Sequence, residues 1–333
     1  MDSELEQLQS LGFFGTIKES FKILFPWKNI FTNIILTLVL PLSIFYLVQI
    51  EIADLISSKV SNPQSNTTTA TTIQGSLSQG SLSHRILLML IKSVGFFLFL
   101  TFYLLSKAAT VYTIACIYTA KQTTYKKVIS VTPRIWKKKA TRHLPLQRSH
   151  LFILQRRRHR NFCLLVPFYC QCRRRSHGRH MDSDLLLCGD CVYQRNLAIA
   201  CVVSVLEDKI GFKAMIKSRE LIKGKMGVGV GTLILFGVCF GGICIIFERF
   251  VVLKWSQSQI SIPVTIGCVV LLVPVTLLLN VVETIIYFVC KPYHQENIDK
   301  SSLSVHLEGY LEDCVKLNSS KDIQLEQQSN SRV

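Results

Sequence analysis

Ionisable and amide side chains inside two long apolar stretches are the residues whose chemistry stands out in this sequence. Lys107 lies within Val94–Ile117, and Asn280 and Glu283 lie within Val264–Val289. Asn280 and Glu283 are three residues apart, so a helix places them on one face. Ionisable groups at bilayer depth are costly and mark ion or solute pathways by default. There are two structural alternatives: Lys107 extends its side chain to the cytosolic interface, and Asn280 with Glu283 only holds helices together.

A segment rich in arginine, histidine and cysteine, residues 141–195, suggests two other functions. Thiolates and imidazoles at short spacings suit zinc, and runs of arginine pair with the phosphates of nucleic acid or anionic lipid. Neither pattern is specific, because the Cys-x-Cys and histidine spacings fit no zinc module. The residues concerned are Cys170, Cys172, His177, His180, Cys188 and Cys191 for zinc, and Arg156–Arg160 and Arg173–Arg175 for phosphate.

Composition favours a third interpretation of residues 141–195, an out-of-frame translation or a wrong exon boundary. The segment holds 11 Arg and 5 His but no Lys and no Glu, whereas the rest of the chain prefers Lys. A frame shift turns the Val, Ala and Ile codons of apolar helices into Arg, Cys and His codons and seldom yields Lys or Glu. We therefore predict that another frame encodes two apolar stretches of about 20 residues.

Long apolar segments are the elements that must position the candidate residues. The chain has 333 residues, of which 49% are hydrophobic, a formal net charge of +17 and a mean hydropathy of +0.34. Apolar stretches near the length of about 20 residues that spans a bilayer exclude a soluble globular protein, a disulfide scaffold and a disordered chain. We predict an all-α, polytopic helical membrane protein. Its transmembrane helices are expected at residues 30–50, 86–120, 228–247 and 264–290, with a remnant of another at 196–206.

The distribution of basic residues predicts the orientation of these helices. The polar loop 51–85 and the short loop 248–263 contain few Lys or Arg, so the positive-inside rule places them in the lumen or outside the cell. The basic segments 121–140 and 207–227 are then cytosolic, as are the ends of the chain at 1–29 and 291–333. Asn66 begins the glycosylation sequon Asn66-Thr67-Thr68 on the lumenal or extracellular side. We expect the protein in the endomembrane system or the plasma membrane.

Three of the cytosolic segments have similar sequences, which predict amphipathic helices. They are residues 13–29, 123–139 and 208–226. Their apolar residues recur at helical spacing beside Lys residues, which suits a helix lying at the lipid boundary with Lys toward anionic headgroups. The alternative is that they are ordinary helices packed beneath the transmembrane bundle. Three such helices, each preceding a transmembrane hairpin, predict an internal repeat. The expected apolar faces are Phe14, Ile17, Phe21 and Leu24 in the first segment, and Phe212, Met215, Ile216 and Ile222 in the third.

Four motifs resemble a plant family of uncharacterised six-span transmembrane proteins. They are LGFFGTIKESFKILF, SVTPRIWKK, VVSVLEDKIGFKAMIKSRELIKGKMG and IIYFVCKPYHQENIDKSSLSVHLEGYL. The resemblance covers residues 8–140 and 196–330 and implies six spans. It fails across 141–195, where members of that family carry apolar helices. More loosely, the plan is similar to the membrane domain beside glycerophosphodiester phosphodiesterases, and no catalytic residue comes with that likeness.

The sequence therefore favours an integral multi-pass membrane protein that is not an enzyme. It shows no nucleophile–base pair, phosphate-binding loop or nucleotide fingerprint. We expect no cofactor, no metal and no nucleic-acid partner, and the lipid bilayer is the partner that the sequence implies. The expected role is to organise the membrane or to act as a scaffold through the interfacial helices. The alternative is a small-solute or ion transporter that uses Lys107 and Glu283.

Overall fold

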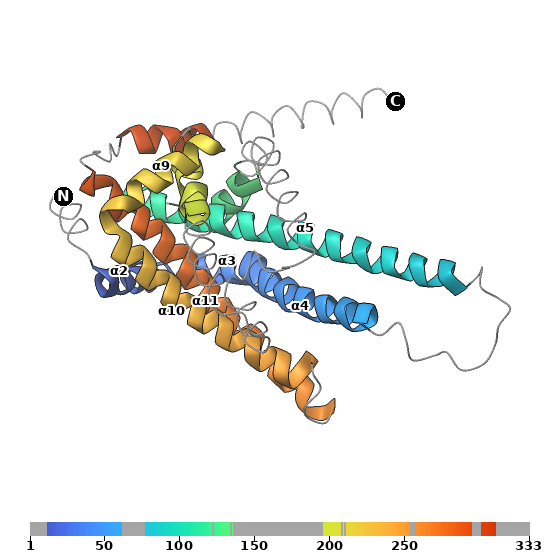
Figure 1. Cartoon of the computed structure of the whole chain (residues 1–333). Helices are drawn as coiled ribbons and strands as arrows, with labels where there is room; N and C mark the ends of the chain where they lie inside the picture. The colour runs from blue at the N-terminus through green and yellow to red at the C-terminus, as the bar shows by residue number, and fades with distance from the viewer. Residues whose placement is uncertain are drawn as a thin grey trace, which may run out of the picture. The chain divides into compact units, whose positions relative to one another are not determined.

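The computed structural model describes residues 12–61, 77–121, 123–133, 135, 196–207, 209, 211–252, 258–294 and 301–310, and most of these residues are helical. The predicted all-helical fold class is confirmed (Figure 1). Within these residues, four helices are long and apolar enough to cross a membrane, and a shorter apolar helix covers Asn196–Leu206. The four candidate spans are Lys28–Ile52, Ser93–Tyr118, Phe212–Val252 and Ile262–Tyr293.

The first candidate span contains an irregular turn next to a proline. Helix α3 (Lys28–Ile34) continues into a π-helical turn, η1 (Ile35–Val39), and then into α4 (Leu40–Ser61). Pro41 is the second residue of α4 and has no N–H to donate to the preceding turn, where its ring also crowds the backbone. A π-helical turn widens the backbone just before such a residue, which lets the span continue through the proline.

The second candidate span belongs to α5 (Leu77–Tyr118), a helix of 42 residues. Residues 51–85 were expected to form a polar loop, but residues 51–61 and 77–85 at its two ends are helical. Helices α4 and α5 therefore extend further into this segment than we predicted. The apolar residues Ile52, Leu55 and Ile56 extend the hydrophobic pattern of α4 beyond residue 50.

Residues 125–133 form a short helix, and the remaining long helices begin with α9. Gly211 precedes α9 (Phe212–Ile222) with a φ of 66°, a backbone conformation that glycine adopts at little cost. A 3₁₀ turn, η2 (Lys223–Lys225), joins α9 to α10 (Met226–Phe247), which ends in the π-helical turn η3 (Glu248–Val252). Helix α11 covers Ser258–Tyr293, and residues 301–310 are also helical.

The chain forms two compact units. The first combines Met1–Ile34, Leu105–Val238 and Leu277–Val333, and the second combines Ile35–Leu104 and Cys239–Thr276. In the second unit, α4 and α5 run antiparallel, because Phe45 stacks on Phe102 and Tyr46 contacts Phe99. The hydroxyl of Tyr46 also lies 3.3 Å from Sγ of Cys244, which joins α10 to this pair.

Candidate functional site

The first compact unit brings the three candidate residues together. Lys107 of α5 forms an ion pair with Glu283 of α11, and their side chains are 1% and 15% exposed. One turn earlier on α11, Asn280 donates a hydrogen bond from Nδ2 to Oγ of Ser106 at 3.2 Å. Two adjacent residues of α5 therefore contact two residues on one face of α11. The alternative in which Lys107 extends to the interface does not agree with its burial.

The polar contacts lie well inside the two candidate spans, at least ten residues from either end. Lys107 precedes the end of its span at Tyr118 by 11 positions, and Glu283 precedes Tyr293 by 10. At 1.5 Å per residue these separations are about 16 and 15 Å, half of a hydrocarbon core about 30 Å thick. The rings of Tyr118 and Phe288 also meet, with centroids 4.5 Å apart, so α5 and α11 run in the same direction here.

Small side chains and backbone-bonded hydroxyls allow the two helices to approach. Ala108 and Ala109 follow Lys107 on α5 and are 4% and 0% exposed. Thr110 donates to the carbonyl of Ser106 at 2.9 Å, and Thr284 donates to that of Asn280 at 2.7 Å. Such hydroxyls satisfy themselves within their own helix and add no unpaired polar group to the interface. Small and polar residues of this kind are typical of helix contacts inside membranes.

A third helix, Asn196–Leu206, contributes a thiol to the same region. Cys201 lies near enough to Lys107 for the two groups to interact electrostatically. Ile199, Val202 and Val203 on this helix are almost fully buried. The ion pair is therefore surrounded by residues of three helices that are distant in sequence. A charged pair in such surroundings requires both partners, because either ion alone would be buried without compensation.

A second charged cluster lies nearer the ends of the helices, around Glu207. Oε1 of Glu207 accepts hydrogen bonds from the Tyr287 hydroxyl at 2.8 Å and from Nζ of Lys291 at 3.0 Å. Burial alone would raise the pKa of Glu207. These hydrogen bonds, together with the charges of Lys291 and Lys209, outweigh burial and hold the pKa below its ordinary value. The cluster ties the end of α11 to the residue that follows Asn196–Leu206.

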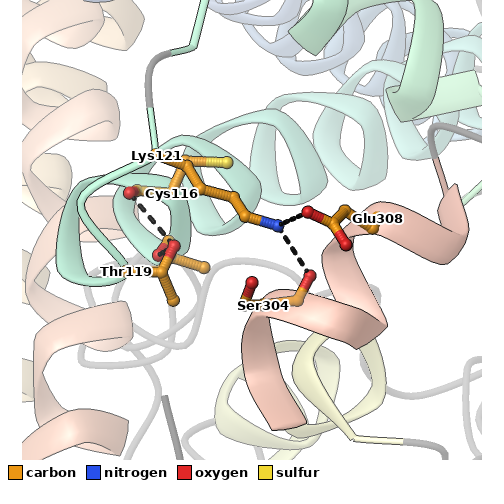
Figure 2. A network of polar contacts seen from close by, with 6 residues as sticks. Cys116, Thr119, Lys121, Ser304 and Glu308 are labelled. Carbon is orange, nitrogen blue, oxygen red and sulfur yellow. Dashed lines mark hydrogen bonds and ion pairs between the residues drawn. The ribbon is translucent and has the colours of Figure 1, made fainter. Parts of the chain in front are cut away.

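The helix at 301–310 is held by contacts that the sequence did not reveal. Helix α5 ends in a Schellman turn: Ala120 has a φ of 53°, and the Lys121 amide donates to the carbonyl of Cys116 at 3.0 Å. This turn directs Lys121 toward the helix, where Nζ pairs with Glu308 and donates to the carbonyl of Ser304 at 3.0 Å (Figure 2).

The same helix also covers the end of Asn196–Leu206. The carbonyl of Val205 is hydrogen-bonded to Nε2 of His306 at 3.3 Å and to the hydroxyl of Tyr310 at 3.4 Å. The last carbonyls of a helix have no partner within it, so these two side chains act as a cap. Leu307 and Tyr310 are buried, with 1% and 4% of their surface exposed.

Helix α2 (Phe13–Leu24) has three distinct faces. Thr16, Ser20 and Ile23 are buried, whereas Phe14 and Phe21 are 82% and 43% exposed. Thr16 and Ser20 donate to backbone carbonyls four residues earlier, at 3.0 and 2.8 Å. Helix α2 therefore packs against the protein through small polar residues and exposes aromatic ones, with Lys18 among the aromatic residues and Lys22 on the third face.

The three predicted amphipathic segments bury equivalent positions. Each segment buries three residues at the spacing i, i+4 and i+7, and the residue at i+4 is Ser or Thr. Ser218 of α9 donates to the carbonyls of Asn196 and Met215, both at 2.9 Å. Of the four residues expected on the apolar face of this segment, Phe212 and Ile216 are exposed and Met215 is half-buried. Ile222 is 2% exposed, so its place on an outer face was wrong. The buried sets are Thr16, Ser20 and Ile23; Val128, Thr132 and Ile135; and Ala214, Ser218 and Leu221.

Several predicted sites lie outside the described residues. They are the sequon at Asn66, the cysteines and histidines at 170–191 and the whole segment 141–195. Within the described part, no group of three or more His, Cys, Asp or Glu is arranged to hold a metal ion. Sequence reasoning found Lys107, Asn280 and Glu283 by hydropathy and missed Ser106, Cys201 and Glu207. The hydroxyl of Ser106 and the thiol of Cys201 do not stand out by hydropathy within an apolar helix. Glu207 lies just beyond the end of the apolar helix Asn196–Leu206, so its carboxylate does not interrupt an apolar stretch.

The chain matches one protein family along almost its whole length. In the part of the chain that the structure describes, the fold is all-helical, with four helices long and apolar enough to cross a membrane and a buried ion pair between two of them. The chain belongs to the family described as Domain of unknown function (DUF8558), whose model matches residues 1–328. No curated protein matches the chain, and no solved structure does.

Proposed function

We propose that this chain is an integral multi-pass membrane protein, not an enzyme, which organises the bilayer or its partners through helices at the membrane interface. The exposed face of α2 carries this proposal. In a water-soluble protein such a helix buries its aromatic residues and exposes its small polar ones. Helix α2 does the opposite, with Phe14 82% and Phe25 70% exposed and Thr16 and Ser20 fully buried. A lipid boundary beside α2 accounts for this arrangement.

The candidate spans support the same proposal. Large apolar side chains are exposed along α10 and along α11, and each set continues for several turns. A contiguous apolar surface of this extent is costly in water and stable in the hydrocarbon core of a bilayer. The exposed residues are Val230, Ile234, Leu235 and Val238 on α10, and Ile262, Ile266, Val270 and Leu271 on α11.

Photocrosslinking to lipid tests the position of α2. The photoreactive residue p-benzoylphenylalanine is incorporated at Phe14 in one variant and at Lys22 in a matched control, and the full chain is reconstituted with radiolabelled phosphatidylcholine. Phe14 lies on the apolar face and Lys22 about 80° around the helix. We expect lipid adducts at Phe14 and several-fold fewer at Lys22. Equal labelling at the two positions, or none at Phe14, would contradict the proposal.

The proposed orientation places α2, α9 and residues 125–135 on the cytosolic side of the endomembrane system or plasma membrane. Lys-rich segments beside the spans support it, by the positive-inside rule. Engineered glycosylation sequons beside Lys126 and Lys217 should stay unmodified, whereas the natural sequon at Asn66 is on the side that is glycosylated. Modification at either engineered position would overturn this topology. We retain the six-span plan of the resembling plant family as part of the proposal.

The buried ion pair favours a second candidate function, transport of a small solute or ion. Lys107 and Glu283 meet well inside their candidate spans, where ionisable groups mark transport pathways by default. The variant Lys107→Met/Glu283→Gln removes both charges together, so neither is left buried alone. Flux of protons and small ions into vesicles that contain wild type or this variant separates the two functions. The organising role predicts no flux to lose, and a flux that the variant abolishes would support transport.

A further inference from the structure

Helices α2 and α9 expose the same stripe of positions but fill it with different residues. In both helices the stripe starts at a phenylalanine, Phe14 or Phe212, and consists of the exposed residues at i, i+4, i+7 and i+11, which lie on one side of a helix. In the stripe of α2, three of the four residues are aromatic, whereas in the stripe of α9 the last two residues are basic. The stripes are Phe14, Lys18, Phe21 and Phe25, and Phe212, Ile216, Arg219 and Lys223.

The charges of the two helices differ in the same direction. Residues 212–225 carry five basic side chains and one acidic residue, Glu220, whereas residues 13–25 carry two basic side chains and one acidic residue. On α2, Glu19 lies 3.5 Å from Lys22 and offsets part of that small charge. On α9, Arg219 and Lys223 are exposed beside Ile216.

The end of α9 is also fixed in place by α11. Nζ of Lys225 lies 5.8 Å from the ring centre of Tyr293, a cation–π contact. The adjacent His294 is hydrogen-bonded through Nε2 to the carbonyl of Leu221 at 3.0 Å. The basic turn that follows α9 is therefore held in one position, which reduces the ordering cost of binding an anionic group.

We infer that α9 and the turn after it bind anionic phospholipid, whereas α2 enters the bilayer boundary through apolar contacts and does not select lipids by charge. The inference rests on the proposed interfacial position of both helices, because it names the lipid class at one of them. Phe212 and Ile216 contact acyl chains, and Arg219 and Lys223 pair with phosphate and carboxylate groups of the headgroups. Each basic residue near a charged leaflet strengthens the attraction about fivefold, and salt weakens it.

Lipid binding to the intact chain tests this inference. Full-length protein in a neutral detergent is mixed with equal amounts of phosphatidylserine and phosphatidylcholine, and bound lipid is counted by native mass spectrometry. Arg219→Gln/Lys223→Gln is compared with Lys18→Gln/Lys22→Gln, which removes the same formal charge from α2. We expect wild type to prefer phosphatidylserine, the α9 variant to lose at least fivefold of that preference, and the α2 variant to lose less than twofold. Raising the ammonium acetate concentration should reduce the preference of wild type.

Three outcomes would overturn the inference. Wild type binds both lipids equally; the two variants lose the same preference; or inorganic phosphate displaces phosphatidylserine, which indicates a site for free anions. Photocrosslinking at Phe14 and Phe212 with neutral lipid separates this failure from failure of the proposed function. Neutral-lipid adducts at both positions without a preference for phosphatidylserine would reject the inference about α9 and leave the interfacial position supported. Loss of the adducts as well would reject both.

Discussion

Replacing Glu283 by glutamine removes the carboxylate that balances Lys107, and its cost follows from how deeply the pair is buried. Breaking a buried ion pair costs about 3–5 kcal/mol, because the remaining charge has no partner. A lysine escapes this cost by releasing its proton, which from an ordinary pKa of about 10.4 costs about 4.6 kcal/mol at pH 7. The same argument caps a stranded glutamate at about 3.7 kcal/mol, from an ordinary pKa of about 4.3. Lys107 is 1% exposed and Glu283 15%, so we expect Glu283→Gln to cost more than Lys107→Met.

A double-mutant cycle measures the coupling directly. We expect about 3–4.5 kcal/mol for Glu283→Gln, about 2–3.5 kcal/mol for Lys107→Met and within about 1 kcal/mol of wild type for the double variant, because no charge is then left alone. The free energy of unfolding is taken from SDS titrations of the full chain in mixed micelles. Cys116, Cys244, Cys268 and Cys290 are buried, so a thiol-reactive dye reports the same transition independently.

The chain supplies a matched control for this cycle. Lys121 and Glu308 also form a Lys–Glu pair, but their side chains are 25% and 55% exposed, and solvent screening limits such a pair to less than about 1 kcal/mol. The cycle Lys121→Met/Glu308→Gln should therefore give a coupling several times smaller than that of the buried pair. A coupling below about 0.5 kcal/mol for Lys107 and Glu283, or one equal to the control, would refute the ion pair.

Three further predictions concern stability. The pKa of Glu207 is lower than ordinary in the folded protein, so its contribution to folding stability is present above about pH 4.3 and is lost as the pH falls through the folded pKa. Melting curves across pH should therefore show that Glu207→Gln lowers the melting temperature at pH 7 and matches wild type in strong acid. Gly224→Ala places a methyl group against the Tyr293 ring and should cost about 1–3 kcal/mol in SDS titrations, whereas Gly227→Ala meets no neighbour and should be neutral or stabilising. Ala120→Gly removes a left-handed non-glycine residue and should raise stability by up to about 1 kcal/mol, and a decrease would contradict the strain argument.

The fold class and the presence of four long apolar helices in the described residues could be predicted because they depend on composition over about 20 residues. The shared face of Asn280 and Glu283 could be predicted from their spacing alone. Their partners could not, because local periodicity does not determine which helices become neighbours. Lys107 could reach the interface or be buried in a pair, and only its proximity to Glu283 in the structure decides between them.

The outer helices show a similar limit. The helical spacing of Phe14 and Phe21 indicated an apolar face, but it did not indicate whether that face packs inward. In α2 the inward face is formed by Thr16, Ser20 and Ile23, which a hydrophobic pattern does not identify. Ile222 was placed outward for the same reason, although it packs beside Leu221 within the first unit. Hydrophobic periodicity identifies the apolar residues of a helix but not which of them pack against the rest of the protein, so it does not separate inner from outer faces where both are apolar.

The internal repeat that the sequence predicts would give the buried ion pair a structural context. Each of the three helices with a buried hydroxyl begins a segment of chain that ends in another helix: α5 for the first, Asn196–Leu206 for the second and α11 for the third. Lys107, Cys201 and Glu283 lie on these three final helices, so each predicted repeat contributes to the polar cluster. Apolar spans precede the final helix in the first and third repeats. The corresponding part of the second is residues 141–195, which lie outside the described residues. If the repeat is complete in the gene, an alternative frame of that segment encodes two apolar stretches of about 20 residues, and interrupted or polar frames would contradict this symmetry.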